Sequence, residues 1–416
     1  MTTRKLSRRR FLAGTTAATA MAATALSTRR SHGANERISV GVIGAGGRGS
    51  YLMDEIHKNA ESHDVEITAV CDVWKVNREA AAGRVKEWFG NEPRAFSRFG
   101  DLIALEDVDA VTIATPDYAH TPIMIAALEA GKDVYVEKPM ALEIENANRA
   151  FDLARKNERV VQCGTQYRSS GGYWAAAKAI GEGVLGPVNR ITAAANFNEP
   201  RWRRGYSNCK EEDVDWEAFL FNRPKRPFDP KLLRRWHFYK DFTNGLSGLW
   251  MSHYVDAVHI ITGAKYPSAA SALGGVYIWK DGREHCDTFH ALLEYPEGFL
   301  FDWGMSLGNS ANNFFTVHGP RGTLEISRNY NVPDSLLLSG EGGAGPDKIQ
   351  ESRRLKPERG ESHMGNWLDC MRTRERPNAD IEYGHQHAVG TIMAAAALHE
   401  GRRMKYDPEK RGMSAL

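Results

Sequence analysis

Residues 38–49 read ISVGVIGAGGRG, an apolar run that ends in Gly44, Gly46 and Gly49 with the spacing G-x-G-x-x-G. This order predicts a strand, a tight turn and the start of a helix. Gly44 permits the turn, Gly46 lets a pyrophosphate approach the backbone, and Gly49 lets the helix pack close to the strand. Because a helix N-terminus offers free N–H groups and a positive dipole end, the stretch predicts a dinucleotide site.

The next expected strand, residues 65–70, leads into an acidic residue. Asp72 lies 23 residues after Gly49, where a carboxylate binds the adenosine ribose hydroxyls. The same charge opposes the 2′-phosphate of NADP, because two close anions in a shielded site repel each other. We therefore expect NAD as the cofactor, with NADP as the alternative.

Length and composition place the chain among ordinary globular proteins with two domains. It has 416 residues, of which 42% are hydrophobic and 25% charged. The formal net charge is +2 and much of the positive excess lies near the N-terminus, which leaves no basic stripe of the kind that binds nucleic acid. We therefore expect no nucleic-acid partner. The five cysteines include no C-x-x-C pair, so we expect no disulfide framework either.

The N-terminus predicts an export signal. Residues 7–12, SRRRFL, resemble the twin-arginine signal of bacteria, and a weakly apolar run rich in Ala and Thr follows up to Leu26. This run is too short and too mild to span a membrane, and residues 23–25, ATA, suit cleavage. We expect residues 1–34 to be signal peptide and linker, and the mature protein to be periplasmic or otherwise exported, without stable membrane insertion. A disordered basic tail is the alternative.

Strands and helices alternate as far as residue 165, which is typical of a parallel sheet covered on both faces. Further strands are expected at residues 109–115, 133–136 and 160–164, with helices at 73–90, 121–129 and 143–156. We therefore expect residues 35–165 to form an α/β domain with a doubly wound Rossmann sheet. In such sheets the ligand lies at the carboxyl ends of the strands.

The pattern changes after Arg168, and residues 166–416 predict an α+β domain with a large open, mostly antiparallel sheet. Its expected strands are residues 188–196, 274–279, 288–295, 299–307, 314–318 and 323–327. Helices are expected at 363–372 and 382–402, and a surface loop at 335–360. Residues 200–244 form a long polar connection rich in aromatics, which are either packed surface residues or contacts for a sugar-like substrate.

The glycine fingerprint, the ATPDYAH string at residues 114–120 and the EKP string at 137–139 together resemble the Gfo/Idh/MocA oxidoreductase family. The resemblance extends over about residues 38–410. It implies an N-terminal dinucleotide-binding domain, a C-terminal domain whose open sheet forms the subunit interface, and hydride transfer at a sugar or cyclitol carbon. We therefore expect a carbohydrate or polyol substrate and a homo-oligomer, a dimer or tetramer, assembled through the C-terminal sheet.

The fingerprint and the resemblance together give the expected site. The cofactor residues are Gly44, Ala45, Gly46, Gly47, Arg48, Gly49, Asp72, Thr115, Pro116, His120, Glu137, Lys138 and Gln166. The candidate substrate contacts are Arg168, Trp236, His237 and Tyr239.

Three residues are expected to carry the chemistry. Lys138 follows a strand end beside the expected nicotinamide, where loss of hydration lowers the pKa of an amine toward the working range. By the resemblance Lys138 is the catalytic lysine, and His253 and Asp256 are the histidine and the acid three residues later. One helical turn separates His253 and Asp256, so we expect both side chains to face the cleft. A neutral imidazole can accept the proton of a substrate hydroxyl.

The sequence departs from the family at one position. Members commonly carry an Asp four residues before the histidine, and this chain has Leu249 there. A leucine binds no hydroxyl, so we expect the substrate position to differ from the family pattern, and the reaction stays open. Asp241, His237 and Tyr239 are the candidates that fill the gap from the preceding aromatic segment.

A metal site is the alternative use of His253, Asp256, His285, Asp287 and His290. These residues lack an established ligand spacing, so we expect none. We expect an exported NAD-dependent oxidoreductase that holds its cofactor tightly, since no free NAD pool exists outside the cytoplasm. Two alternatives stay open. One is an NAD-dependent glycosidase that works by transient oxidation and elimination, and the other is a carbohydrate-binding module without turnover.

Replacing both Arg8 and Arg9 with Lys is expected to leave the precursor in the cytoplasm, because a twin-arginine signal needs both guanidinium groups. Fractionation of cells that express the wild type and the double variant measures this. Unchanged export of the double variant would show that residues 1–34 are not such a signal.

Overall fold

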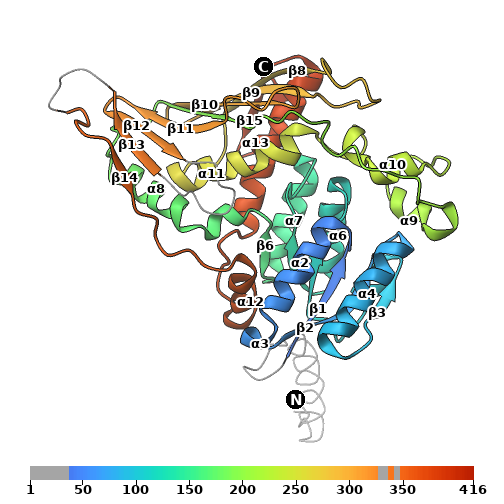
Figure 1. Cartoon of the computed structure of the whole chain (residues 1–416). Helices are drawn as coiled ribbons and strands as arrows, with labels where there is room; N and C mark the ends of the chain where they lie inside the picture. Colours follow the sequence, from blue (N-terminus) through green and yellow to red (C-terminus); the bar gives the residue numbers. More distant parts are fainter. Residues whose placement is uncertain (1–36, 327–335, 342–346) are drawn as a thin grey trace, which may run out of the picture. The chain divides into compact units, whose positions relative to one another are not determined.

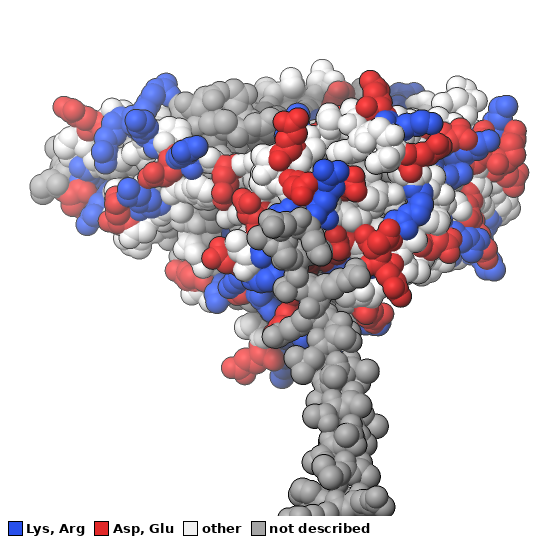
Figure 2. Space-filling view, turned by 90° about the horizontal axis from the view of Figure 1, so that it is seen from below, with Lys and Arg blue, Asp and Glu red and all other residues white. Residues whose placement is uncertain are grey.

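The computed structural model describes residues 37–326, 336–341 and 347–416 (Figure 1). The expected export segment, residues 1–34, lies outside the described residues. Within the described part of the chain, no helix is long and apolar enough to cross a membrane. The face seen in Figure 2 carries interspersed basic and acidic side chains.

The first half forms the predicted doubly wound α/β domain. Its six-stranded sheet is parallel throughout, with the strand order β3-β2-β1-β4-β5-β6. The strands are β1 (Ile38–Ile43), β2 (Val65–Cys71), β3 (Arg94–Phe96), β4 (Ala110–Ile113), β5 (Asp133–Val136) and β6 (Val161–Cys163). The central strands are wholly buried, because helices cover both faces of the sheet. These helices are α2 (Gly47–Lys58), α3 (Ala60–His63), α4 (Lys75–Phe89), α5 (Phe99–Ile103), α6 (Asp117–Glu129) and α7 (Ile144–Lys156).

The second half contains the predicted large sheet. Its order is β14-β13-β12-β11-β7-β10-β9-β8-β15-β16, and every described pairing is antiparallel except β7 with β10. Burial alternates along β9, so one face packs and the other is open. The strands are β7 (Arg190–Ala194), β8 (Ala269–Gly275), β9 (Thr288–Tyr295), β10 (Phe299–Ser306), β11 (Phe314–Gly319), β12 (Gly322–Ile326), β13 (Leu336–Gly340), β14 (Arg353–Leu355), β15 (Met404–Asp407) and β16 (Gly412–Ala415).

Three longer helices accompany this sheet: α8 (Gly171–Gly181), α11 (Ser252–Thr262) and α13 (Ile381–Glu400). A fourth, α12 (His363–Thr373), packs into the core of the Rossmann half. In Figure 1 α11 and α13 run between the large sheet and the Rossmann half. Residues 200–244, here called the aromatic excursion, contain only short helices, among them α9 (Trp216–Leu220), α10 (Pro230–Arg234) and η3 (Trp236–Phe238).

Two sequence expectations about the second half were wrong. The strand expected at residues 274–279 ends at Gly275, because the Asp287 carboxylate accepts the backbone N–H groups of residues 277, 278 and 279 at 3.0, 2.8 and 2.8 Å. These N–H groups are therefore not available to a strand partner. The loop expected at residues 335–360 contains β13 and β14, which extend the sheet.

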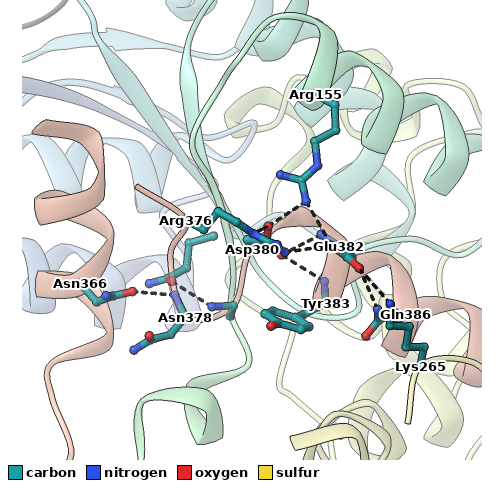
Figure 3. A network of polar contacts seen from close by, with 11 residues as sticks. Arg155, Lys265, Asn366, Arg376, Asn378, Asp380, Glu382, Tyr383 and Gln386 are labelled. Atoms are coloured by element: carbon teal, nitrogen blue, oxygen red, sulfur yellow. Dashed lines mark hydrogen bonds and ion pairs between the residues drawn. The ribbon is translucent and has the colours of Figure 1, made fainter. Parts of the chain in front are cut away.

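An ion-pair network fixes the start of α13 (Figure 3). Asp380 caps this helix by accepting the N–H groups of Glu382 and Tyr383 at 3.0 and 3.4 Å. The same carboxylate pairs with Arg155 of α7 at 3.0 Å and with Arg376 at 2.7 Å. The Asp380 side chain is nearly buried, so these cations compensate its desolvation and tie α13 to the Rossmann half.

Several histidines are buried as neutral rings. The ring nitrogens of His363 contact Ser169 Oγ at 2.7 Å and the carbonyl oxygen of Cys163 at 3.0 Å. Burial lowers the pKa of His363 to about 4 and that of His387 to about 3. Protonation of either ring would place a charge in the interior, which is costly.

The free energy of unfolding is expected to decrease as the pH falls below about 6.5. The unfolded chain protonates these histidines near that pH, whereas the folded chain does so only at about 4 or below. The unfolded state therefore binds more protons in this window, and each histidine lowers the free energy of unfolding by about 1.4 kcal/mol per pH unit. Urea unfolding at pH 7, 6 and 5 measures the slope. His387→Gln should reduce the slope, and a flat profile for the wild type would contradict the assignment.

Candidate active site

A cavity of about 790 Å³ opens at the carboxyl ends of the parallel strands. One wall comes from the first half: the glycine turn after β1 and the ends of β2, β4 and β5. The opposite wall comes from the aromatic excursion and from residues 249, 250 and 253. Such a concave space at strand ends is the usual ligand site of an α/β sheet, as the sequence predicts.

The glycine turn leaves room for a phosphate group. Gly44 has φ +85°, and a Cβ on it would lie 2.7 Å from the backbone of Ala114. A Cβ on Gly49 would lie 1.8 Å from the carbonyl oxygen of Gly44. Both positions therefore require glycine. The helix α2 begins with no side chain capping its N-terminus, so these residues fit the pyrophosphate of a dinucleotide.

Asp72 follows β2 in the cavity wall and is 8% exposed. Its carboxylate accepts the N–H groups of Ala45 at 2.9 Å and Trp74 at 2.8 Å, and the side-chain amide of Asn77 at 3.3 Å. Burial raises the pKa of the Asp72 carboxyl, and the N–H groups of Trp74 and Ala45 oppose that rise. The carboxylate is thus held rigidly beside the glycine turn, where the fingerprint places the ribose.

Lys138 and Glu137 follow β5 and lie in the same wall. The Lys138 Nζ donates to the carbonyl oxygen of Leu249 at 2.6 Å. Burial lowers the pKa of Lys138, and the carboxylates of Asp117 and Glu137 partly offset that effect. The Glu137 carboxylate also pairs with Arg48 at 2.6 Å. A lysine with this lowered pKa suits exchange of a proton or a hydrogen bond with a reacting oxygen.

His253 enters the cavity from the opposite wall. A turn of π-helix, η4 (Ser247–Met251), runs directly into α11 and presents this ring. Burial lowers the pKa of His253 well below its ordinary value, and the positive charges of Lys138 and Arg48 lower it further. Its Nδ1 is buried without a hydrogen-bond partner in the described chain. The ring is therefore neutral and has an unused nitrogen.

Leu249 lines the cavity where the family resemblance expects a carboxylate. Of the three candidates to replace that carboxylate, His237 lines the cavity, whereas Asp241 pairs with Arg226 at 2.6 Å and Tyr239 lies outside the lining. The His237 ring stacks on Trp236 with centroids 3.6 Å apart. Burial lowers its pKa well below the ordinary value, so a neutral imidazole stands beside Leu249.

The structure corrects the expectations for Asp256 and Arg168, which do not line the cavity. The Arg168 Nε donates to the Asp256 Oδ1 at 2.8 Å, and both side chains are buried. The guanidinium also lies 3.7 Å from the ring centroid of Tyr383. Asp256 therefore faces the element η1 (Gln166–Ser169) rather than the cleft, because an unpaired carboxylate on this packed side of α11 would be costly. The pair holds α11 in place.

The remaining expected cofactor residues surround the glycine turn. His120 bridges two segments of this wall, because its ring nitrogens contact the carbonyl oxygens of Pro139 and Thr115, each at 2.9 Å. Ala45 and Gly49 do not line the cavity: the Ala45 N–H donates to Asp72, and Gly49 packs against the Gly44 carbonyl. The other members line the cavity: Gly46, Gly47, Arg48, Thr115, Pro116, Glu137 and Gln166.

The cavity is also lined by Asn77, Phe99, Phe219 and Phe221, which the sequence did not indicate as site residues, and by Trp202, one of the aromatics expected to be either packed surface residues or sugar contacts. The density of aromatics in the aromatic excursion was the available signal for the last three. As to metals, the described residues contain no group of three or more His, Cys, Asp or Glu side chains able to hold an ion.

Comparison with known proteins gives the family. Residues 38–165 match the model described as the NAD-binding Rossmann fold of an oxidoreductase family, GFO_IDH_MocA. Residues 173–325 match the GFO/IDH/MocA C-terminal domain. The first model covers the Rossmann half of the fold, and the second covers most of the half that contains the large sheet.

Relatives and solved structures agree with these matches. The chain is 32% identical over 151 residues to inositol 2-dehydrogenase of Salmonella typhimurium, which covers 36% of this chain and 43% of that protein. The chain thus matches less than half the length of this relative. It is 25% identical over 307 residues to the uncharacterized oxidoreductase YdgJ of Escherichia coli, covering 74% and 76%.

A similar fold occurs in the WlbA dehydrogenase of Bordetella pertussis, solved with NADH and UDP-GlcNAcA. The TM-score is 0.67 at 20% identity, over 89% of this chain and 99% of that one. At this identity the likeness concerns the fold.

Asp72→Ser is expected to shift the affinity ratio of NADP to NAD upward by about tenfold or more, because it removes the charge that opposes a 2′-phosphate. Isothermal titration with both dinucleotides measures the ratio, and thermal unfolding checks that the variant folds. Asp107→Ser, which removes an exposed carboxylate paired with Arg94, is the control. An unchanged ratio in Asp72→Ser would contradict the assigned role.

Proposed function

The chain belongs to the Gfo/Idh/MocA oxidoreductase family, and we propose that it transfers hydride between a bound NAD and the carbinol carbon of a sugar, cyclitol or related polyol. One observation carries this proposal. Lys138 from the Rossmann half and His253 from the second half line one cavity together with a glycine turn that fits a dinucleotide. The inositol 2-dehydrogenase relative supports a polyol as substrate.

Two side chains, His253 and Lys138, act on the substrate oxygen, and the nicotinamide, when bound, accepts or returns the hydride at the carbon. The neutral His253 ring takes the hydroxyl proton as the carbon is oxidised. The Lys138 ammonium has three N–H donors, and the bond to Leu249 uses one of them. The others are available to stabilise the negative charge that develops on the oxygen.

His237 takes over substrate positioning in the absence of the family carboxylate. Its neutral ring lines the cavity beside Leu249 and can donate to, or accept from, a neighbouring hydroxyl. Trp202 and Trp236 flank it in the same wall. Flat apolar faces beside neutral polar groups suit a ring with many hydroxyls and little net charge.

Export and self-association form part of the proposal. An exported enzyme meets no free NAD pool, so the cofactor stays bound to the protein between turnovers. The open face of the large sheet is the proposed subunit interface, since Leu273, Leu292 and Leu300 are exposed there on adjacent strands. Light scattering on the purified protein tests this: a dimer or tetramer supports the interface and a monomer contradicts it.

Lys138→Ala and His253→Ala are each expected to lower kcat by about 10²-fold or more while dinucleotide binding persists, because each removes a group that moves or holds the substrate proton. Steady-state kinetics and titration with NAD measure the two effects separately. His259→Gln, on the same helix but bonded to Tyr295 outside the cavity, is the matched control. Near-full turnover in both alanine variants would overturn the assignment.

The reaction type needs a second assay, in which free sugars, cyclitols and aryl glycosides are incubated with the purified protein. We expect net reduction of the nicotinamide, seen by its absorbance, with a free sugar or cyclitol. Release of aglycone without net reduction would instead establish a glycosidase. A protein that binds sugars and does neither is a binding module.

A further inference from the structure

One end of the cavity is built from both halves of the chain and lies beyond Asp72. Trp74, Ser97 and Phe99 line it from the Rossmann half, and Phe219 and Phe221 line it from the aromatic excursion. We propose that residues 214–221, here called the clamp, close the adenosine end of the dinucleotide site, and that the touching rings of Phe99 and Phe221 form the aromatic wall of the slot in which the adenine ring stacks. This inference rests on the proposed use of a dinucleotide.

The order of the dinucleotide's parts fixes the direction in which the adenine lies. The nicotinamide reacts beside Lys138, the pyrophosphate lies at the glycine turn, and the adenosine ribose lies at Asp72. The adenine must therefore extend past Asp72, away from Lys138. The cavity continues there between the residues after β2, the residues after β3 and the clamp.

Main-chain contacts join the clamp to the edge of the ribose site. Trp74 and Val214 form an isolated antiparallel bridge. The N–H of Asp215 donates to the carbonyl oxygen of Val73 at 2.9 Å. Val73 and Trp74 are the two residues that follow Asp72, so the clamp is attached directly beside the carboxylate assigned to the ribose.

Side chains after β3 hold the clamp a second time. The Arg98 guanidinium donates to the Asp215 carboxylate at 3.0 Å and to the Glu217 carboxylate at 3.0 Å. Ser97 Oγ donates to the same Asp215 carboxylate at 3.1 Å. Asp215 also caps α9 by accepting the N–H of Ala218 at 3.1 Å. One carboxylate thus orients the short helix and anchors it to the Rossmann half.

The backbone conformation and the exposure of Phe221 are unusual for a residue that serves only to fill a core. It follows α9 with φ 49°, in the left-handed region that a side chain of this kind rarely adopts. Its ring is 40% exposed and meets the Phe99 ring edge to face, with centroids 5.4 Å apart. Behind it Phe219 is buried and stacks on Phe242 at 5.6 Å. A large exposed ring held by a strained backbone at a cavity wall suits a flat aromatic ligand such as adenine.

The clamp should set how long the dinucleotide stays bound. Residues 214 and 215 contact Val73, Trp74 and Arg98 beside the adenosine end, so by this proposal the base leaves when the clamp parts from these residues. Parting breaks main-chain and ionic contacts together, which makes dissociation slow.

The test measures how fast labelled NAD dissociates from the full-length protein after a chase with excess unlabelled NAD. A second measurement gives the affinity for nicotinamide mononucleotide, which lacks adenosine. Phe221→Ser is expected to release NAD about tenfold faster, the effect of losing one base–aromatic contact, with unchanged affinity for the mononucleotide. Arg98→Ala should also release NAD faster. Tyr206→Ser removes a similarly exposed ring of the aromatic excursion outside the cavity, and Arg94→Ala removes an exposed ion pair with Asp107; both should match the wild type.

The outcomes separate this inference from the proposed function. Dissociation from Phe221→Ser at the wild-type rate, or an equal loss of affinity for NAD and the mononucleotide, would overturn the adenine slot while the wild type still binds NAD. A wild type that binds no dinucleotide would overturn the proposed function and the slot together. If Phe221→Ser fails to fold, Phe221→Leu replaces it, because leucine keeps an apolar side chain and removes the aromatic ring. Release of NAD from Phe221→Leu no faster than from the wild type would again overturn the slot.

Discussion

The active site depends on keeping the Lys138 ammonium in a poorly hydrated cavity wall. A charged amine removed from water is costly unless hydrogen bonds and opposite charges compensate it. Here the carbonyl oxygen of Leu249 accepts from it at 2.6 Å, and the carboxylates of Asp117 and Glu137 favour its charged form. Because Leu249 belongs to the second half, this hydrogen bond also fixes where α11 begins and therefore where His253 lies.

A second set of buried charges holds α11 from its other side. The ion pair of Arg168 with Asp256 lies one helical turn beyond His253, and the Arg168 guanidinium rests on the Tyr383 ring at the start of α13. Asp380 fixes that start through its cap and its arginine partners. The positions of His253 and Lys138 thus follow from contacts that no single helix or strand supplies.

The loss of the family carboxylate at position 249 changes the character of the site. The carboxylate would be a charged acceptor, whereas Leu249 contributes an apolar side chain and a main-chain carbonyl, and His237 contributes a neutral ring. The imidazoles of His237 and His253 are neutral because burial opposes their protonation. The aromatic excursion supplies much of this wall, so the substrate side of the cavity and its adenosine end are built by one segment.

The sequence by itself determined the local features: the glycine turn, the acid after β2, the lysine after β5 and the alternation that gives a parallel sheet. Spacing and periodicity reveal these features, because the backbone conformation at each motif depends mainly on residues that are close in the sequence. Only the tertiary structure decided that Asp256 turns toward Arg168, that the Lys138 ammonium meets the Leu249 carbonyl, and that Phe221 faces Phe99. Each of these contacts joins residues at least 88 positions apart. The packing of helices and strands on one another determines which residues meet, and this packing produces no periodic pattern in the sequence.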